Sequence, residues 1–265
     1  MSKRIIKDYK AEAQYIIDWI QTFFAKNAQS KHSPAIIGIS GGKDSTVVAY
    51  LCAAALGKDN VVGVKMPCHA QHDIADADAV IAELGIVDYQ INIGDMVDAV
   101  HTELKRAEIN SEASWVKNNI PPRIRMTVLY AVAAANAGLV ANTSNLSERT
   151  VGWSTKWGDS VGDFAPLADY TVEEVLGIGE ALGIPEHLLY KEPEDGLTGK
   201  SDEENLGVSY YQIDQYIRGK ENPQPYEAYR RIINYTEIAQ HKKINLPQPY
   251  ARLDWDVPTE EYGYF

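Results

Sequence analysis

The residues with the clearest chemical potential are Ser40-Gly41-Gly42-Lys43-Asp44-Ser45, which lie between a short apolar run and a helical pattern. The adjacent glycines let successive backbone amides turn inward as an anion-binding nest, and the N-terminus of the following helix favours negative charge. The two serines add hydroxyl donors. The segment therefore predicts a phosphate-binding loop. It is not a Walker A loop, because in that pattern the lysine is followed by Ser or Thr and here it is followed by an acid.

Asp44 extends this chemistry. A carboxylate beside a phosphate site would repel the phosphates unless a divalent cation bridges the two, so Asp44 predicts Mg²⁺. The alternative is a glycine-rich turn in which Asp44 is only a first-turn helix acid. The full Ser-Gly-Gly-x-Asp-Ser pattern between a strand and a helix favours the phosphate site.

Strands and helices alternate around this loop. Short, continuous apolar runs predict strands at 35–39, 60–66, 87–93 and 139–143. Helical patterns cover 7–26, 46–56, 73–84, 95–107 and 123–137. Such strands, lacking polar alternation and separated by helices, are typical of a parallel sheet covered on both faces, so we expect an α/β fold with a doubly wound parallel sheet. Ligands bind at the carboxyl ends of such strands, which points to the loops after Ile39, Met66 and Asn142.

The second half of the chain is less regular. Past Gly152 polar loops lengthen, and the acidic segment 191–206 lacks apolar periodicity, which predicts a flexible loop. Two further helices are expected near 209–219 and 224–242. The tail that follows is rich in Pro, Tyr and acids, and we interpret it as a cap on the core or a partner surface.

Composition narrows the class of protein. The chain has 265 residues, 45% of them hydrophobic and 23% charged, and no internal repeat, so we expect one domain over 1–265. The net charge of −12 argues against a broad nucleic-acid surface. No apolar run is long enough to span a membrane and no signal-peptide pattern is present, so we expect no membrane association and a cytoplasmic location. Cys52 and Cys68 lack the spacing of a zinc site.

The phosphate loop, in its strand-loop-helix context, resembles the pyrophosphate-binding loop of the adenine nucleotide alpha hydrolase class. Enzymes of that class cut ATP between the alpha and beta phosphates and transfer AMP to a substrate oxygen. Segments 64–67, 71–77, 142–148, 152–159 and 209–220 together resemble the ammonia-dependent NAD synthetase family. The resemblance spans nearly the whole chain. The stretch Thr155-Lys156-Trp157-Gly158-Asp159 and its distance from Glu148 are its most specific parts.

The resemblance implies an activity and a set of site residues. ATP would adenylylate the nicotinic-acid carboxylate of deamido-NAD with loss of pyrophosphate, and ammonia would displace AMP to give NAD. The implied ATP contacts are Gly38, Ile39, Ser40, Gly41, Gly42, Lys43, Asp44, Ser45 and Thr143. The implied Mg²⁺ ligands are Asp44 and Glu148, and the implied catalytic residues are Asp44 and Lys156. Deamido-NAD would be held by Arg123, Lys156, Asp163, His241 and Lys242, and the family resemblance implies a homodimer.

Some of these residues have plainer interpretations. Glu148 could cap a short helix, and Arg123 could simply follow the Pro121-Pro122 turn on a solvated face. The basic run 241–243 could complement the dipole at a helix C-terminus. Only 34 residues precede the first expected strand, which we interpret as too few for a glutaminase domain, so ammonia is the expected nitrogen source.

The chain also departs from the family pattern. Pro122 replaces a common Ala, which should stiffen the entry to the helix at 123–137. A lysine commonly used toward ATP phosphates falls on Val172, and a small hydroxyl residue falls on Glu194. Either Lys191 or Lys200 supplies the missing cation, or nucleotide binding is weaker, or the acceptor differs. The open alternatives are an AMP-forming ligase of the same class acting on another carboxylate and a catalytically silent nucleotide-binding homologue.

Overall fold

The computed structural model describes residues 6–70, 74–190, 201–219 and 225–249. Its centre is a parallel four-stranded sheet in the order β3-β2-β1-β4. The strands are β1 (Ala35–Gly38), β2 (Val61–Lys65), β3 (Val87–Gln90) and β4 (Leu139–Val140). Because the chain first moves outward from β1 to β3 and then returns to the other side of β1, the topological switch point lies between β1 and β4. The predicted doubly wound α/β fold is confirmed.

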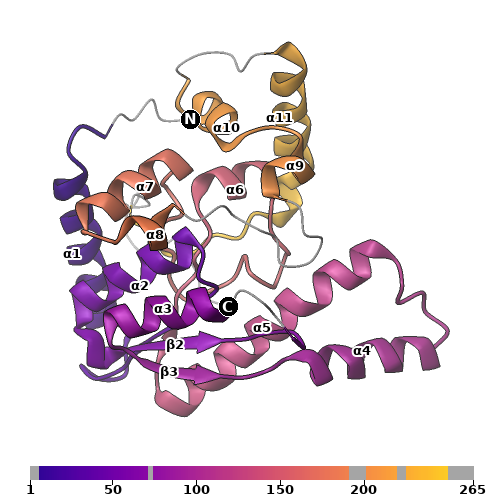
Figure 1. Cartoon of the computed structure of the whole chain (residues 1–265), viewed down its shortest axis with the longest axis horizontal. Helices are drawn as coiled ribbons and strands as arrows, with labels where there is room; N and C mark the ends of the chain where they lie inside the picture. The colour runs from indigo at the N-terminus through magenta and orange to yellow at the C-terminus, as the bar shows by residue number, and fades with distance from the viewer. Residues whose placement is uncertain (1–5, 71–73, 191–200, 220–224, 250–265) are drawn as a thin grey trace, which may run out of the picture.

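Helices cover both faces of the sheet (Figure 1). One face carries α1 (Tyr9–Asn27), α2 (Lys43–Leu56), α3 (Ile74–Leu84) and α7 (Val172–Ala181). The other carries α4 (Gly94–Arg106) and α5 (Ser114–Asn136). Neighbouring residues of β1 point to opposite faces of the sheet. Ile37 packs in the core of the first face, and Ile36 packs in the core of the second. This division explains why β1 is apolar without alternation.

The edge strand β3 differs from the expectation of burial on both faces. All four of its residues are exposed, with Val87 at 49% and Tyr89 at 42%. The strand pairs with β2 alone among the described strands, and Asp88 lies 2.9 Å from the buried ammonium of Lys65. A charged residue on a short edge strand discourages pairing with another chain, so the run at 87–93 was an edge rather than a core strand.

Helix α5 begins nine residues earlier than predicted and contains Pro121 and Pro122. The sequence indicated a turn there, because proline lacks an N–H and its ring crowds the carbonyl four residues earlier. Here Ile120 and Pro121 are buried, and a Cβ built on Gly158 would lie 3.0 Å from Pro122 Cβ. Tertiary packing therefore holds the two prolines inside the helix, and Pro122 does not mark its entry. Helices α4 and α5 project together from the sheet (Figure 1).

The C-terminal half forms a third cluster of short helices. They are α6 (Leu146–Val151), α9 (Asp202–Leu206), α10 (Tyr210–Arg218) and α11 (Tyr226–Ile238). The short α8 (Glu186–Leu189) instead packs Leu188 and Leu189 in the core of the first face. A 3-10 turn over Lys58–Asn60 precedes β2, and another over Ala239–Lys242 follows α11. Part of the predicted flexible loop is helical, because Ser201 and Glu204 form a capping box for α9; the remainder, 191–200, lies outside the described residues.

The first residues of the C-terminal tail pack on the core. Ala165 N donates to Pro247 O at 2.8 Å, and the Tyr15 hydroxyl donates to Pro249 O at 2.9 Å. These contacts agree with the predicted capping role as far as residue 249, and the rest of the tail lies outside the described residues.

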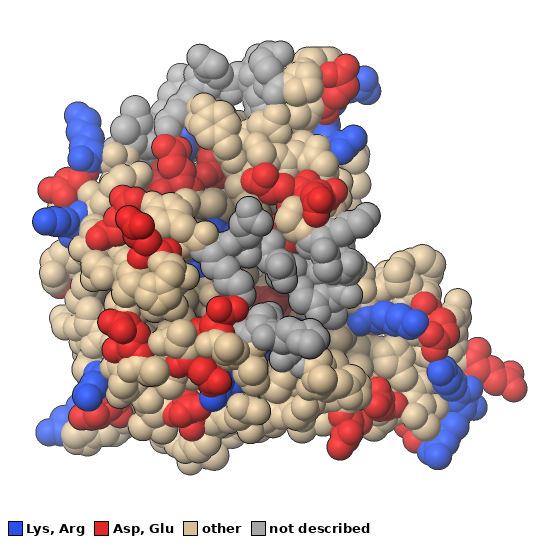
Figure 2. All heavy atoms as spheres, viewed as in Figure 1, with Lys and Arg blue, Asp and Glu red and all other residues tan. Residues whose placement is uncertain are grey.

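Among the described residues on the face shown in Figure 2, charged side chains are spread out and form no continuous basic band. On the face shown in Figure 2, acidic side chains are scattered widely, and basic ones lie mainly at the rim and on the arm formed by α4 and α5. Within the described residues no helix is both long and apolar enough to cross a membrane.

Asp214 joins α10 to the site-bearing helices. It is 2% exposed, and its carboxylate accepts hydrogen bonds from Ser147 Oγ at 2.5 Å and from Glu173 N at 2.9 Å. Burial raises the pKa of Asp214 from 3.8 to about 6, despite these hydrogen bonds. The folded protein therefore binds this proton more tightly than the unfolded chain does.

The elevated pKa predicts a pH dependence of stability. A carboxyl group whose pKa is higher in the folded than in the unfolded state stabilises the protein less as pH rises. The Asp214 contribution to the free energy of unfolding should therefore fall by about 2 kcal/mol from pH 4.5 to 7.5. Urea unfolding of the unaltered chain and of Asp214→Asn across this range measures it. The difference between the two proteins should change with pH by that amount, and a difference independent of pH would contradict the prediction.

Candidate active site

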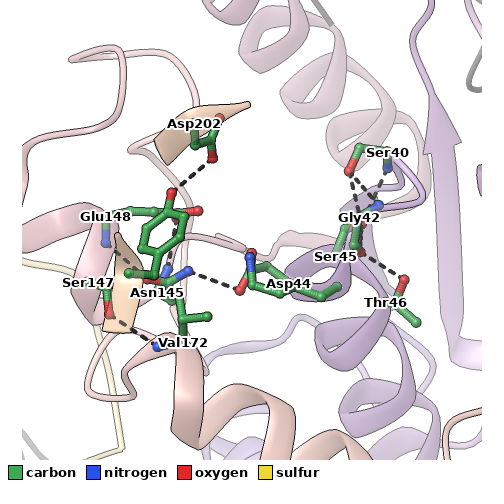
Figure 3. A network of polar contacts seen from close by, with 12 residues as sticks. Ser40, Gly42, Asp44, Ser45, Thr46, Asn145, Ser147, Glu148, Val172 and Asp202 are labelled. Carbon is green, nitrogen blue, oxygen red and sulfur yellow. Dashed lines mark hydrogen bonds and ion pairs between the residues drawn. The ribbon is translucent and has the colours of Figure 1, made fainter. Parts of the chain in front are cut away.

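The phosphate loop occupies the turn from β1 into α2. The helix begins at Lys43 rather than at the predicted residue 46, so Asp44 and Ser45 lie in its first turn, where the helix dipole favours anions. Gly42 N donates to Ser40 Oγ at 3.2 Å, and the hydroxyls of Ser40 and Ser45 lie 3.2 Å apart (Figure 3). These hydroxyls and the turn of backbone amides are the donor set that a polyphosphate requires.

A cavity of about 750 Å³ opens beside this loop, at the carboxyl ends of β1, β2 and β4. This is the switch-point position that the sequence predicted. Of the predicted site residues, those that line it are Gly38, Ile39, Ser40, Gly42, Asp44, Ser45, Thr143, Glu148 and Lys242.

Asp44 and Glu148 come together through Asn145. Asp44 Oδ1 accepts from Asn145 Nδ2 at 3.1 Å, so the side chain reaches from α2 toward α6 (Figure 3). Asn145 N in turn donates to Glu148 Oε2 at 3.2 Å, and Glu148 N donates to Asn145 Oδ1 at 3.0 Å. The helix-capping alternative for Glu148 is therefore confirmed, because these bonds form a capping box for α6.

The electrostatics of this pair favour a bound cation. Burial, and after it the charge of Asp44, raises the pKa of Glu148 well above its usual value. Two hard carboxylates at the edge of a phosphate site fit Mg²⁺, which commonly binds through one or two carboxylates together with substrate phosphates. Within the described residues, no cluster of three or more His, Cys, Asp or Glu side chains could hold a metal without such help.

Lys43 lies behind this pair rather than in the cavity. Its side chain is nearly buried, and its ammonium contacts Asp44 Oδ2 at 3.0 Å and lies 5.3 Å from the centre of the Tyr210 ring. Burial acts to lower the pKa of Lys43, but the charges of Asp44 and Glu148 outweigh it and raise the pKa. Lys43 therefore neutralises and orients the carboxylates from α10's side.

Helices α9 and α10 close the same side of the site. The Tyr210 hydroxyl donates to Asp202 Oδ2 at 2.9 Å, and Asp202 lines the cavity. Position 172, where the family commonly has a lysine, also belongs to this region. Val172 N donates to Ser147 Oγ at 3.1 Å, and its side chain packs against the apolar cluster of α6, α10 and α11. Lys191, Glu194 and Lys200 lie outside the described residues.

Arg123 and Lys156 lie together but do not line the cavity. Arg123 is exposed, and its Nε donates to Lys156 O at 3.3 Å. The Lys156 ammonium lies 5.6 Å from the centre of the Trp157 ring, and Trp157 is 55% exposed with a φ of +61°. A tryptophan in this region of backbone space is unusual and marks a strained loop.

Asp163 makes contacts that connect the sheet and α5. Its carboxylate accepts from Val140 N at 2.7 Å and from the Tyr130 hydroxyl at 3.3 Å, and it does not line the cavity. His241 is exposed and its ring contacts Ile238 O. Lys242 does line the cavity, and its ammonium donates to Gly152 O at 2.9 Å and to Ser154 O at 2.8 Å.

Three residues of the site were missed from the sequence: Asp202 and Arg125, which line the cavity, and Asn145, which contacts Asp44. Arg125 Nε donates to Met66 O at 3.2 Å, which ties α5 to the loop after β2. Arg123 and Arg125 are two residues apart on α5, so their side chains point in different directions. Arg123, the residue selected from the sequence, is exposed, whereas Arg125 lines the cavity. The Asn-x-x-Glu capping-box pattern at 145–148 was a readable signal for Asn145.

The switch-point cavity, its phosphate loop and the paired carboxylates define an ATP-using enzyme with the adenine nucleotide alpha hydrolase-like fold. The family model described as NAD synthase matches residues 12–248. The chain belongs to the NAD synthase family. It is 40% identical over 211 residues to the NH(3)-dependent NAD(+) synthetase of Thermococcus sibiricus, a match that covers 79% of this chain and 80% of the relative.

Solved structures agree with this assignment. The NMN synthetase of Francisella tularensis has a TM-score of 0.81 and 30% identity, covering 91% of this chain and 98% of that one. The NH3-dependent NAD synthetase of Campylobacter jejuni has a TM-score of 0.70 and 27% identity, with the same coverage. The fold and the family predicted from the sequence are therefore confirmed.

Proposed function

We propose that this chain uses ATP to amidate deamido-NAD with ammonia, giving NAD, AMP and pyrophosphate. The carboxylate oxygen of the nicotinic-acid group attacks the alpha phosphate of ATP, and pyrophosphate leaves with the electron pair of the broken P–O bond. Ammonia then attacks the acyl carbon, the bond to AMP breaks, and a proton is released. The observation that carries the proposal is the phosphate loop joined by Asn145 to two carboxylates, in a chain of the NAD synthase family.

The first substrate is ATP, bound along Gly38–Ser45 and Thr143. In this proposal Asp44 and Glu148 hold Mg²⁺, with Asn145 and Lys43 fixing the orientation of Asp44. The metal would neutralise charge on the phosphates during adenylyl transfer. The amides and hydroxyls of the loop supply the remaining contacts to the leaving pyrophosphate.

Deamido-NAD is the second substrate. In the proposal, Arg123 and Lys156 reach its anionic groups from the cavity rim, and His241 and Lys242 bind it from the end of α11. The contacts of Asp163 with Val140 N and Tyr130 favour a positioning role over direct binding. We further propose a cytoplasmic homodimer of single-domain chains; Trp115, 71% exposed on the α4–α5 arm beside the cavity, is a candidate interface residue.

A mass-spectrometric assay tests the function directly. Purified protein is incubated with ATP, Mg²⁺, deamido-NAD and ammonium, and glutamine replaces ammonium in the control. We expect NAD and AMP to form in equal amounts with ammonium and not with glutamine. Because the Francisella structure carries the name NMN synthetase, nicotinic acid mononucleotide is compared as an alternative acceptor. A higher kcat/KM for the mononucleotide would overturn the dinucleotide assignment, and no AMP with either acceptor would overturn the proposed activity.

A further inference from the structure

A second cavity lies against the first on the side of α11. Its volume is about 230 Å³. Its wall includes Arg149, Asp169, Thr236, Lys242 and Lys243. Of the roles proposed above, only the deamido-NAD contact of Lys242 involves this wall.

The two cavities share a wall. Ser144, Gly152, Ser154 and Lys242 line both of them. The Lys242 ammonium donates to the carbonyls of Gly152 and Ser154, so this side chain ties together three of the four shared residues. A change of the Lys242 rotamer would break these two hydrogen bonds without requiring a movement of the backbone.

The second cavity is lined by exposed and by buried residues. Lys243 and Asn245 are exposed, whereas Ser144 and Thr150 are buried. Most polar groups on its wall are uncharged hydroxyls and amides. Two charged groups of the wall contact the protein: Arg149 Nη2 donates to Ile244 O at 3.2 Å, and the Asp169 carboxylate accepts from Gln248 Nε2 at 2.8 Å.

We propose that this second cavity is the entry route for ammonia, with Lys242 as its inner gate. The inference rests on the proposed function. In the proposed reaction the main cavity holds the acyl-adenylate when ammonia attacks, so a separate path would let the small third substrate reach the acyl carbon. Hydroxyl and amide groups suit neutral ammonia, and the three positive charges of Arg149, Lys242 and Lys243 outnumber the one negative charge of Asp169, so the wall disfavours ammonium. The route therefore delivers the form that has the free electron pair for attack on the acyl carbon.

Thr236 offers a clean test, because it lies on the cavity wall and its hydroxyl only donates to Ile232 O within α11. Thr236→Phe should fill the route and lower kcat/KM for ammonium about tenfold or more, with unchanged KM for ATP and deamido-NAD. Thr22→Phe is the matched control, because Thr22 makes the same intrahelical bond to Asp18 O and is exposed on α1, outside the cavity wall. It should leave all constants unchanged.

A second readout separates this inference from the proposed function. Exchange of labelled pyrophosphate into ATP with deamido-NAD requires adenylylation but no ammonia, so Thr236→Phe should leave it intact. Loss of exchange in this variant would overturn the ammonia route and favour an anion-binding role for the cavity. Absence of exchange in the unaltered chain would instead overturn the proposed function.

A variant that widens the cavity tests the route independently of whether Thr236→Phe folds. Thr236→Ala should raise the rate with methylamine relative to ammonia severalfold, since methylamine is the larger nucleophile. An unchanged ratio, or an unchanged kcat/KM for ammonium in a folded Thr236→Phe protein, would overturn the route.

Discussion

Replacing Asp44 with Asn is expected to lower kcat by about 10²- to 10³-fold while the protein remains folded. The change removes a negative charge without changing the shape of the side chain. Asn145 Nδ2 can still donate to the remaining carbonyl oxygen, so the link between α2 and α6 survives. What is lost is a hard oxygen ligand for the proposed Mg²⁺ and the charge that Lys43 pairs with.

The measurement has two parts. Steady-state kinetics over a range of Mg²⁺ concentrations should show a lower kcat and a higher Mg²⁺ requirement. Binding of Mn²⁺ in the presence of a non-hydrolysable ATP analogue, followed by electron paramagnetic resonance, reports the site without turnover and should weaken about 10- to 100-fold.

Asp95→Asn is the control for this experiment, because Asp95 is also a first-turn helix acid but is exposed on α4, outside the cavity. It should behave as the unaltered chain. Equal Mn²⁺ affinity in Asp44→Asn and the unaltered chain would remove Asp44 from the proposed metal site.

Gly41→Ala is expected to destabilise the protein by about 3 kcal/mol and to abolish measurable ATP binding. Gly41 has a φ of +79°, where residues with a Cβ are strained. The new Cβ would also lie 2.5 Å from Asp76 Cβ and 2.9 Å from Ala77 N, so α3 or the phosphate loop must move. Either movement disturbs the amides that bind phosphate.

Gly183→Ala isolates the cost of backbone strain. Gly183 has a φ of +74°, and a Cβ built there has no neighbour within 4 Å. Chemical denaturation should show a loss of about 1 to 2 kcal/mol for this control, and calorimetric titration should show unchanged ATP-analogue binding. If Gly41→Ala lost no more stability than Gly183→Ala, the close approach of α3 to the loop would not constrain the site.

The strands, the phosphate loop and most helices were predicted from short patterns in the sequence. The apolar runs of β1 and β2, the glycines of the loop and the helical periodicities depend on neighbours in the chain, so they were legible without tertiary information. The position of the cavity also followed, because the order of strands and helices determines where a doubly wound sheet changes direction.

Long-range packing decided the rest. Burial of Ile120 and Pro121 kept two prolines inside α5, against their local preference for a turn. The contact between Lys43 and Tyr210 also depends on long-range packing. The two residues are far apart in the sequence, and only the folded chain brings the Tyr210 ring to the Lys43 ammonium.

By itself, the sequence determined the fold class, the phosphate loop and the family, because these depend on residue types at short spacing. Only the tertiary structure decided that Asn145 links Asp44 to Glu148, that Arg125 rather than Arg123 lines the cavity, and that Lys242 lines two cavities. Such contacts depend on side-chain directions and on segments about a hundred residues apart. No local pattern encodes these distances, since they result from packing of the whole chain.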